Sequence, residues 1–122
     1  MPDESVTVES RDGKHVGQRI LRLSGKLTFP TPDDDERFLK QILVEPASTV
    51  ILDLSGVTSC DSSGVGELMR IHISFKREKR RLALAATREK VGTILKVAKV
   101  LEYFNVFATV EEAEAEMMKL SI

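Results

Sequence analysis

The strongest constraint on the fold is a run of six residues, Thr49–Leu54, with the sequence TVILDL. The run is β-prone and almost wholly apolar, which is typical of a central strand that is covered on both faces of its sheet. Patterns of strands and helices alternate through the rest of the chain. The run therefore predicts an α/β fold in which other elements pack on a buried central strand.

A hairpin is predicted before this strand. Val6–Val8 and Ile20–Leu23 have the pattern of short strands, and a turn signal, Arg11–Lys14 (RDGK), lies between them. A helix is then predicted to start at Thr31, which can cap it, with Pro32 at its first position and acidic residues 33–36 at the positive end of its dipole. Its buried face is expected to hold Phe38, Leu39, Ile42 and Leu43.

A second helix is predicted from about Ser63 to Lys79. On a helical wheel its apolar residues form one broad arc, and charged or polar residues fall opposite. The arc holds Val65, Leu68, Met69, Ile71, Ile73 and Phe75, and the opposite side holds Glu67, Arg70, Ser74, Arg77 and Glu78. This helix is therefore expected to have one buried side and one solvent-exposed side.

The remaining chain continues the alternation. A strand is predicted at Leu82–Ala85, a third helix around Val91–Val97, a short edge strand at Val106–Ala108 and a last helix from about Val110 to Leu120. In the last helix, Met117, Met118 and Leu120 are expected to pack inward, and the acidic run Glu111–Glu116 to face solvent. The order implies a small mixed sheet of four to five strands flanked by about four helices.

The composition fits one soluble cytoplasmic domain over residues 1–122. Hydrophobic residues make up 42% of the chain and charged residues 30%, as in an ordinary globular protein. A net charge of −1 gives no electrostatic reason to expect nucleic acid. The N-terminus lacks the features of a signal peptide, no segment approaches the roughly 18 apolar residues that span a bilayer, and Cys60 alone can form no internal disulfide.

The most unusual stretch follows the central strand. Thr58–Ser63 (TSCDSS) gathers five hydroxyl or carboxylate side chains, with Gly56 before them and Gly64 and Gly66 after them. The start of a helix presents unpaired N–H groups that favour an anion, so a phosphoryl group on Ser62 could be accommodated there. The alternative is that these residues only cap the helix, since Ser and Asp are the usual cap residues.

No catalytic or metal site is predicted. A nucleophile elbow requires Gly-x-Ser-x-Gly, and Ser62 has Cys60 two residues before it. Gly64-Val65-Gly66 lacks the further residues of a dinucleotide-binding or phosphate-binding loop. Cys60 has no partner at metal-ligand spacing and is expected to be a buried thiol, while His72 is expected to be a packed core or rim residue. The basic cluster Lys76–Arg81 suits the negative end of a helix dipole without any ligand.

Two segments carry a resemblance to a known family. Val50–Thr58 (VILDLSGVT), followed by Asp61–Leu68 (DSSGVGEL), closely resembles the STAS domains of bacterial anti-sigma-factor antagonists. The likeness extends to Phe104–Phe107 and to the closing Glu111–Ala113 helix, so that it covers most of the chain from about residue 16 onward. The resemblance implies a STAS fold, which agrees with the predicted order of strands and helices.

The resemblance also implies a function that depends on partner switching. In the family an anti-sigma factor, which is also a serine kinase, phosphorylates the first serine after the aspartate, here Ser62. The unphosphorylated antagonist binds the anti-sigma factor and releases the sigma factor for transcription, phosphorylation abolishes that binding, and a PP2C-type phosphatase reverses it. The expected protein is a monomer or weak dimer without enzymatic activity or cofactor, and without direct contact with nucleic acid or a membrane.

The partner-binding surface implied by the resemblance combines one short motif with one more distant residue. It comprises Asp61, Ser62, Ser63, Gly64, Val65, Gly66 and Thr28. Relatives often have an acidic residue near the position of Thr28, and Gly-Gly where this chain has Lys79-Arg80. The alternative function is that of a STAS scaffold or interaction module, stressosome-like or associated with a transporter, without a phosphorylation switch.

Overall fold

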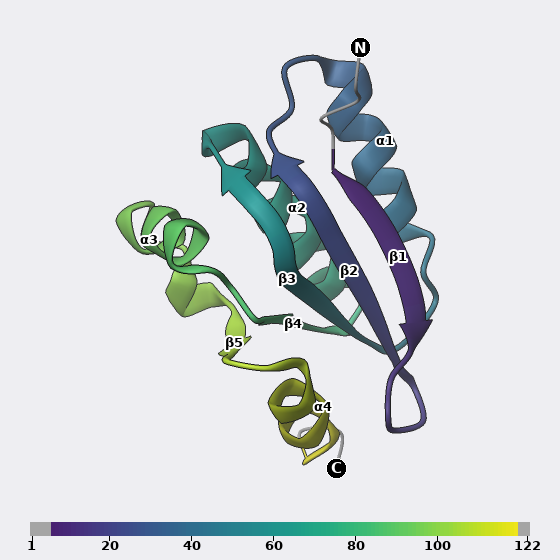
Figure 1. Cartoon of the computed structure of the whole chain (residues 1–122). Coiled ribbons are helices and arrows are strands. Elements are labelled where there is room, and N and C mark those ends of the chain that lie inside the picture. The colour runs from purple at the N-terminus through teal and green to yellow at the C-terminus, as the bar shows by residue number, and fades with distance from the viewer. Residues whose placement is uncertain (1–5, 120–122) are drawn as a thin grey trace.

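A five-stranded sheet organises the chain in a computed structural model that describes residues 6–119 (Figure 1). The strands are β1 (Thr7–Asp12), β2 (Gln18–Leu27), β3 (Thr49–Cys60), β4 (Arg81–Ala85) and β5 (Asn105–Phe107). The helices are α1 (Pro32–Leu43), α2 (Ser62–Arg77), α3 (Glu89–Val97) and α4 (Val110–Lys119), with a short 3₁₀ helix, η1 (Leu101–Tyr103), before β5. The predicted mixed α/β architecture is confirmed.

The strands lie in sequence order across the sheet. β1 and β2 form the predicted antiparallel hairpin, and β2, β3, β4 and β5 are parallel. Each parallel pair is joined through a helix, as parallel strands require: α1 follows β2, α2 follows β3 and α3 follows β4. The central strand β3 pairs with β2 on one side and β4 on the other.

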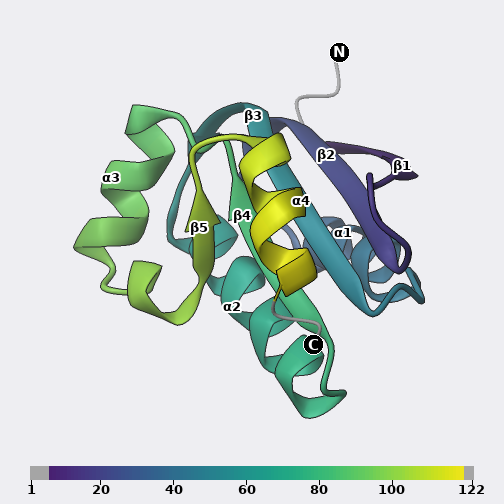
Figure 2. The same ribbon diagram turned by 90° about the horizontal axis from the view of Figure 1, so that it is seen from below.

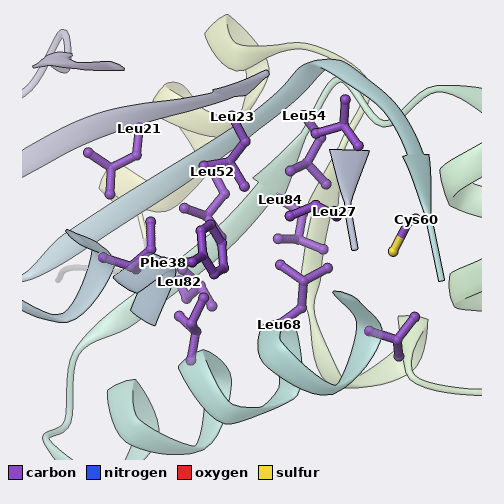
Figure 3. Packing of buried hydrophobic residues seen from close by; sticks show 14 of the residues in the cluster. Leu21, Leu23, Leu27, Phe38, Leu52, Leu54, Cys60, Leu68, Leu82 and Leu84 are labelled. Atoms are coloured by element: carbon purple, nitrogen blue, oxygen red, sulfur yellow. The ribbon is translucent and has the colours of Figure 1, made fainter. Parts of the chain in front are cut away.

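Both faces of the sheet are covered, as the apolar run predicted. α1, α2 and α3 share the larger core with side chains such as Leu52 of β3, whereas α4 packs on the opposite face over Ile51 (Figure 2). Every residue of Thr49–Leu54 is buried. In the larger core, Leu68 of α2 points toward Leu27 and Leu84, and Cys60 lies at the end of β3 (Figure 3).

The first helix begins as predicted. Thr31 is the N-cap of α1, its side chain accepts a hydrogen bond from the Asp34 N–H group, and Pro32 occupies the first turn. Phe38, Leu39 and Ile42 are buried, but the prediction for Leu43 was wrong, since this residue ends the helix with 37% of its surface exposed. On a wheel Leu43 lies about 90° from the centre of the other three.

Two residues of α2 lie on the side opposite to the one predicted. Ile73, predicted to lie in the buried arc, has 48% of its surface exposed, and Glu67, predicted to lie on the solvent-exposed side, has only 5% exposed. The buried arc is centred near Leu68, Ile71 and Phe75; at about 100° per residue Glu67 lies next to Ile71, whereas Ile73 lies far from the centre. α1 packs against α2, and its Asp35 lies near the Glu67 carboxyl group.

The last helix also departs from prediction. Met117 is buried as expected, but Met118 is 40% exposed, and Leu120 lies outside the described residues. Glu114 does not face solvent: it is buried, its carboxylate accepts a hydrogen bond from the Lys14 N–H group (2.5 Å), and its carbonyl oxygen accepts one from the Gln18 side chain (2.8 Å). These bonds tie α4 to the β1–β2 hairpin.

α2 ends in a left-handed turn made without glycine. Lys79 has φ of 59°, its N–H group donates to the Lys76 carbonyl, and the Arg80 N–H group donates to the Phe75 carbonyl at 2.8 Å. This is the hydrogen-bond pattern of a Schellman motif, in which glycine is the usual left-handed residue. The Arg80 guanidinium lies 4.0 Å from the Phe75 ring centroid and donates to the Ala47 carbonyl at 3.0 Å.

Within residues 6–119 no helix has both the length and the apolar character needed to cross a lipid bilayer.

Candidate functional site

The candidate site lies where the carboxyl ends of β2 and β3 meet the start of α2 (Figure 1). Leu27, the last residue of β2, pairs with Cys60, the last residue of β3, and α2 begins two residues later at Ser62. Strand β3 is longer than predicted because Ser55–Cys60 continues it, with irregularities in its register against β2. The polar motif is therefore held between a strand end and a helix start.

Asp61 is the N-cap of α2. Its Oδ1 atom accepts hydrogen bonds from the N–H groups of Ser63 (3.0 Å) and Gly64 (3.2 Å), and from the Ser63 hydroxyl (2.5 Å). The Ser63 hydroxyl, followed by these backbone N–H groups, lowers the pKa of the Asp61 carboxyl despite some desolvation. Asp61 is therefore a carboxylate at neutral pH, and it fills the usual anion position at the start of the helix.

The Ser63 hydroxyl links the start of α2 to the connection between β2 and α1 instead of capping the helix. It donates to Asp61 and also accepts a hydrogen bond from the Phe29 N–H group at 2.9 Å. Phe29 lies in the connection between β2 and α1, so this bond fastens that connection to the start of α2. Both functions of the Ser63 oxygen, as donor and as acceptor, are thus used inside the protein.

Ser62 is placed differently. It is the first residue of α2, and its side chain is exposed. Within residues 6–119 no group forms a hydrogen bond with its hydroxyl. Two adjacent serines thus differ in accessibility: the Ser63 hydroxyl is engaged, and the Ser62 hydroxyl faces solvent beside the Asp61 carboxylate.

Gly64 and Val65 lie beneath the surface of the site. Both are buried, and a Cβ atom on Gly64 would overlap the Leu27 carbonyl oxygen and lie 2.9 Å from the Cys60 sulfur. The absence of a side chain at Gly64 therefore lets α2 pack directly on the end of β2. The resemblance implies that these two residues belong to the partner-binding surface; in the structure their side-chain positions face inward and support the site from below.

Gly66 and Thr28 border the site at its surface. Gly66 is exposed, and a Cβ atom there would have no neighbour within 4 Å. Thr28 is half-buried and stands between Leu27, which pairs with Cys60, and Phe29, which bonds to Ser63. The fold thus brings Thr28 beside the Asp61–Ser63 motif although more than thirty residues separate them.

Glu67, one turn into α2, was missed by sequence reasoning. One carboxylate oxygen accepts a hydrogen bond from Arg70 at 3.1 Å, and the other is buried with no hydrogen-bond partner among the described residues. Burial raises the pKa of this carboxyl, against the opposing effect of Arg70, and the nearby carboxylate of Asp35 on α1 raises it further. The one sequence signal for it is its place on the helical wheel, next to Ile71 at the edge of the apolar arc.

Cys60 and His72, the other two residues considered in the sequence for metal binding or catalysis, are both packed against neighbouring side chains. Cys60 is buried, and burial, with the nearby Asp61 charge, raises the pKa of its thiol to about 11. His72 is a partly buried rim residue, as expected, with its ring centroid 5.3 Å from that of Phe104, and burial followed by the charge of Lys76 lowers its pKa. Across residues 6–119 no three histidine, cysteine or acidic side chains gather as metal ligands would.

Comparison with known proteins places the fold in a family. The family model of the STAS domain matches residues 6–113, and the chain therefore belongs to the STAS domain family. This match includes the whole candidate site, from Thr28 to Gly66.

Solved structures share this fold. An anti-sigma factor antagonist from Mycobacterium paratuberculosis is 17% identical with a TM-score of 0.78, over 94% of this chain and 96% of that one. The anti-sigma factor antagonist SpoIIAA in its unphosphorylated form is 19% identical with a TM-score of 0.71, over 93% and 97%. A sulfate transporter family protein from Wolinella succinogenes is 22% identical with a TM-score of 0.75, over 88% and 89%. At these identities the likeness establishes the fold.

Proposed function

We propose that this STAS-domain chain is an anti-sigma-factor antagonist that binds a kinase-type anti-sigma factor and is released when Ser62 is phosphorylated. Binding of the unphosphorylated chain would free a sigma factor for transcription, and a PP2C-type phosphatase would restore the binding form. In this proposal the chain acts by binding in the cytoplasm, as a single domain, and catalyses no reaction.

The observation that carries the proposal is the difference between the two serines. A kinase requires an accessible hydroxyl, and Ser62 is exposed at the start of α2, whereas the Ser63 hydroxyl is held between Asp61 and the Phe29 N–H group. Phosphorylation of Ser63 would first have to break both bonds. The similarity to SpoIIAA, solved in an unphosphorylated form, also supports a phosphorylation-dependent function.

The electrostatics of the site support a release mechanism. A phosphate on Ser62 adds about −1.5 to −2 charges beside the Asp61 carboxylate, which already occupies the N-cap. Two unit charges about 5 Å apart repel by roughly 3 kcal/mol at an effective dielectric constant of about 20. This repulsion exists in the free chain too, so it opposes binding only because a bound partner excludes water and lowers the local dielectric constant. Closing a partner over this pair of anions would also remove water from both. Together these effects could weaken binding by about two orders of magnitude or more.

The test is to incubate the protein with candidate anti-sigma kinases from the same genome and ATP, and to map the phosphate by mass spectrometry. Phosphate on Ser62, lost in Ser62→Ala and retained in Ser63→Ala, is the expected result. Ser63→Ala is the matched control, because it removes the neighbouring hydroxyl. Phosphate on Ser63 alone would contradict the proposed site.

The same experiment tests the alternative function. A chain that no candidate kinase phosphorylates or binds would instead be a STAS scaffold or interaction module, stressosome-like or associated with a transporter.

Hydrolysis of an ester, nucleotide or peptide by the purified chain, lost in Ser62→Ala, would contradict the proposal that it is not an enzyme.

A further inference from the structure

The face of α2 that carries Ser62 continues along the helix as an exposed stripe, which we define as Ser62, Gly66, Met69 and Ile73. Residues spaced by three and four lie on one side of a helix, so these four form a line from the start of α2 to its last turns. Ile73 is 48% exposed and Met69 is partly buried. An exposed isoleucine in line with the candidate phosphorylation site has no role in the core.

A hollow of about 370 Å³ lies at the far end of the stripe. Its walls combine apolar and basic side chains from α2 with one residue of η1, and they are Met69, His72, Ile73, Lys76, Arg77 and Tyr103. Tyr103 is 54% exposed. Apolar walls around such a hollow suit the side chains of an amphipathic helix more than a polar small molecule.

The lysine and the arginine that line the hollow, Lys76 and Arg77, both carry positive charge. Lys76 and Arg77 are exposed, and the described residues provide neither of them with a carboxylate partner. Within residues 6–119 no carboxylate lines the hollow, and Glu78, the residue after Arg77, pairs with Arg80 at 3.0 Å. A partner with carboxylates beside its apolar residues would complement this rim.

Gly66 adds an independent feature. Glycine within a helix is unfavourable relative to alanine, and the open space above Gly66 shows that no internal contact requires it there. A smooth helix surface at this point allows the backbone of a partner to approach α2 closely between Ser62 and the hollow.

We propose that the stripe and its hollow are the docking surface for an acidic amphipathic helix of the anti-sigma factor. Apolar side chains of that helix enter the hollow between Ile73 and Tyr103, and its carboxylates face Lys76 and Arg77. This inference rests on the proposed function, because it takes the anti-sigma factor as the partner. The proposed contact therefore runs along α2 from Ser62 at its start to Lys76 and Arg77 at its end.

The test is the affinity of the unphosphorylated protein for its anti-sigma factor, measured by calorimetry. Two variants are compared with wild type, Ile73→Glu and the double variant Lys76→Glu/Arg77→Glu. Each is expected to weaken binding by about tenfold or more, since it places negative charge against acidic side chains. The double variant should also show a smaller dependence of affinity on salt.

A control of equal charge is Arg11→Glu/Lys40→Glu, which changes exposed residues on β1 and α1. It should bind within about twofold of wild type, since charges far from an interface contribute little at moderate salt. All the changed residues are exposed, and circular dichroism checks that each variant is folded.

The possible failures are distinguishable. If wild type binds the anti-sigma factor and both stripe variants bind equally well, the docking surface is wrong and the proposed function stands. If wild type does not bind, the proposed function itself fails. Binding of wild type to phosphatidylserine vesicles or duplex DNA that only the double variant loses, with anti-sigma binding unchanged, would assign the surface to a membrane or nucleic acid and overturn the proposal.

Discussion

Two glycines in the first turns of α2 should respond to alanine with opposite signs. A Cβ atom on Gly64 would overlap the Leu27 carbonyl oxygen and press on the Cys60 sulfur, whereas one on Gly66 would meet no atom within 4 Å. Both positions are inside the same helix, so the intrinsic gain from replacing glycine is the same. Only the tertiary contact differs between them.

The magnitudes follow from these contacts. Gly66→Ala should raise the free energy of unfolding by about 0.5–1 kcal/mol, the usual cost of glycine in a helix. Gly64→Ala has the same gain, but its overpacking costs about 1–3 kcal/mol or more, because the obstructing atom is a backbone carbonyl that cannot rotate away. Because the overlap is with a backbone atom, the upper part of that range applies, about 2–3 kcal/mol, and Gly64→Ala should therefore destabilise the protein by about 1–2.5 kcal/mol.

The assay is urea unfolding of the two variants and wild type, followed by circular dichroism. We expect the midpoints to order as Gly66→Ala, wild type and Gly64→Ala, from highest to lowest, with similar dependence on urea. A Gly64→Ala variant as stable as wild type would refute the direct packing of α2 on the end of β2. That contact is what positions Ser62.

Three further predictions concern neighbouring groups. Glu67→Gln should raise the free energy of unfolding by about 0.5–1 kcal/mol at pH 7, since it removes a buried charge. Because folding raises the pKa of Glu67, this gain, measured by urea unfolding, should shrink as the pH falls through that pKa toward 4.5. A gain that stays constant with pH would contradict the raised pKa. Lys79→Gly should stabilise the protein by about 0.5–1 kcal/mol, because it relieves a left-handed lysine; a loss of stability in thermal unfolding would argue against the Schellman turn. Cys60, with a thiol pKa of about 11, should react with Ellman's reagent at pH 8 slowly when folded and rapidly in urea, and fast reaction of the folded protein would contradict its burial.

The fold could be predicted from sequence where the pattern of apolar residues was unambiguous. The run Thr49–Leu54 indicated a central strand, and the cap residue Thr31 marked the start of α1 within one residue. The helical wheel failed at Glu67 and Ile73, because a wheel shows how apolar residues cluster but not which neighbour covers the edge of the cluster. α1 determines that edge, and it comes from a distant part of the sequence.

The candidate site could be located but not resolved from sequence. The motif Asp61–Gly64 indicated a polar strand-to-helix junction, and the structure has one there. The division between the two serines depends on the Phe29 N–H group, which is 34 positions away from Ser63. The difference between Gly64 and Gly66 likewise depends on Leu27. Such contacts leave no local pattern in the sequence.

The central claim is that phosphate on Ser62 ends binding to the anti-sigma factor. The most direct measurement is a calorimetric titration of that factor with the unphosphorylated protein and with protein phosphorylated to completion, under identical salt conditions. We predict a loss of affinity of about a hundredfold or more on phosphorylation, and persistent binding by Ser62→Ala after treatment with kinase and ATP. Equal affinity of the phosphorylated and unphosphorylated forms would contradict the switch.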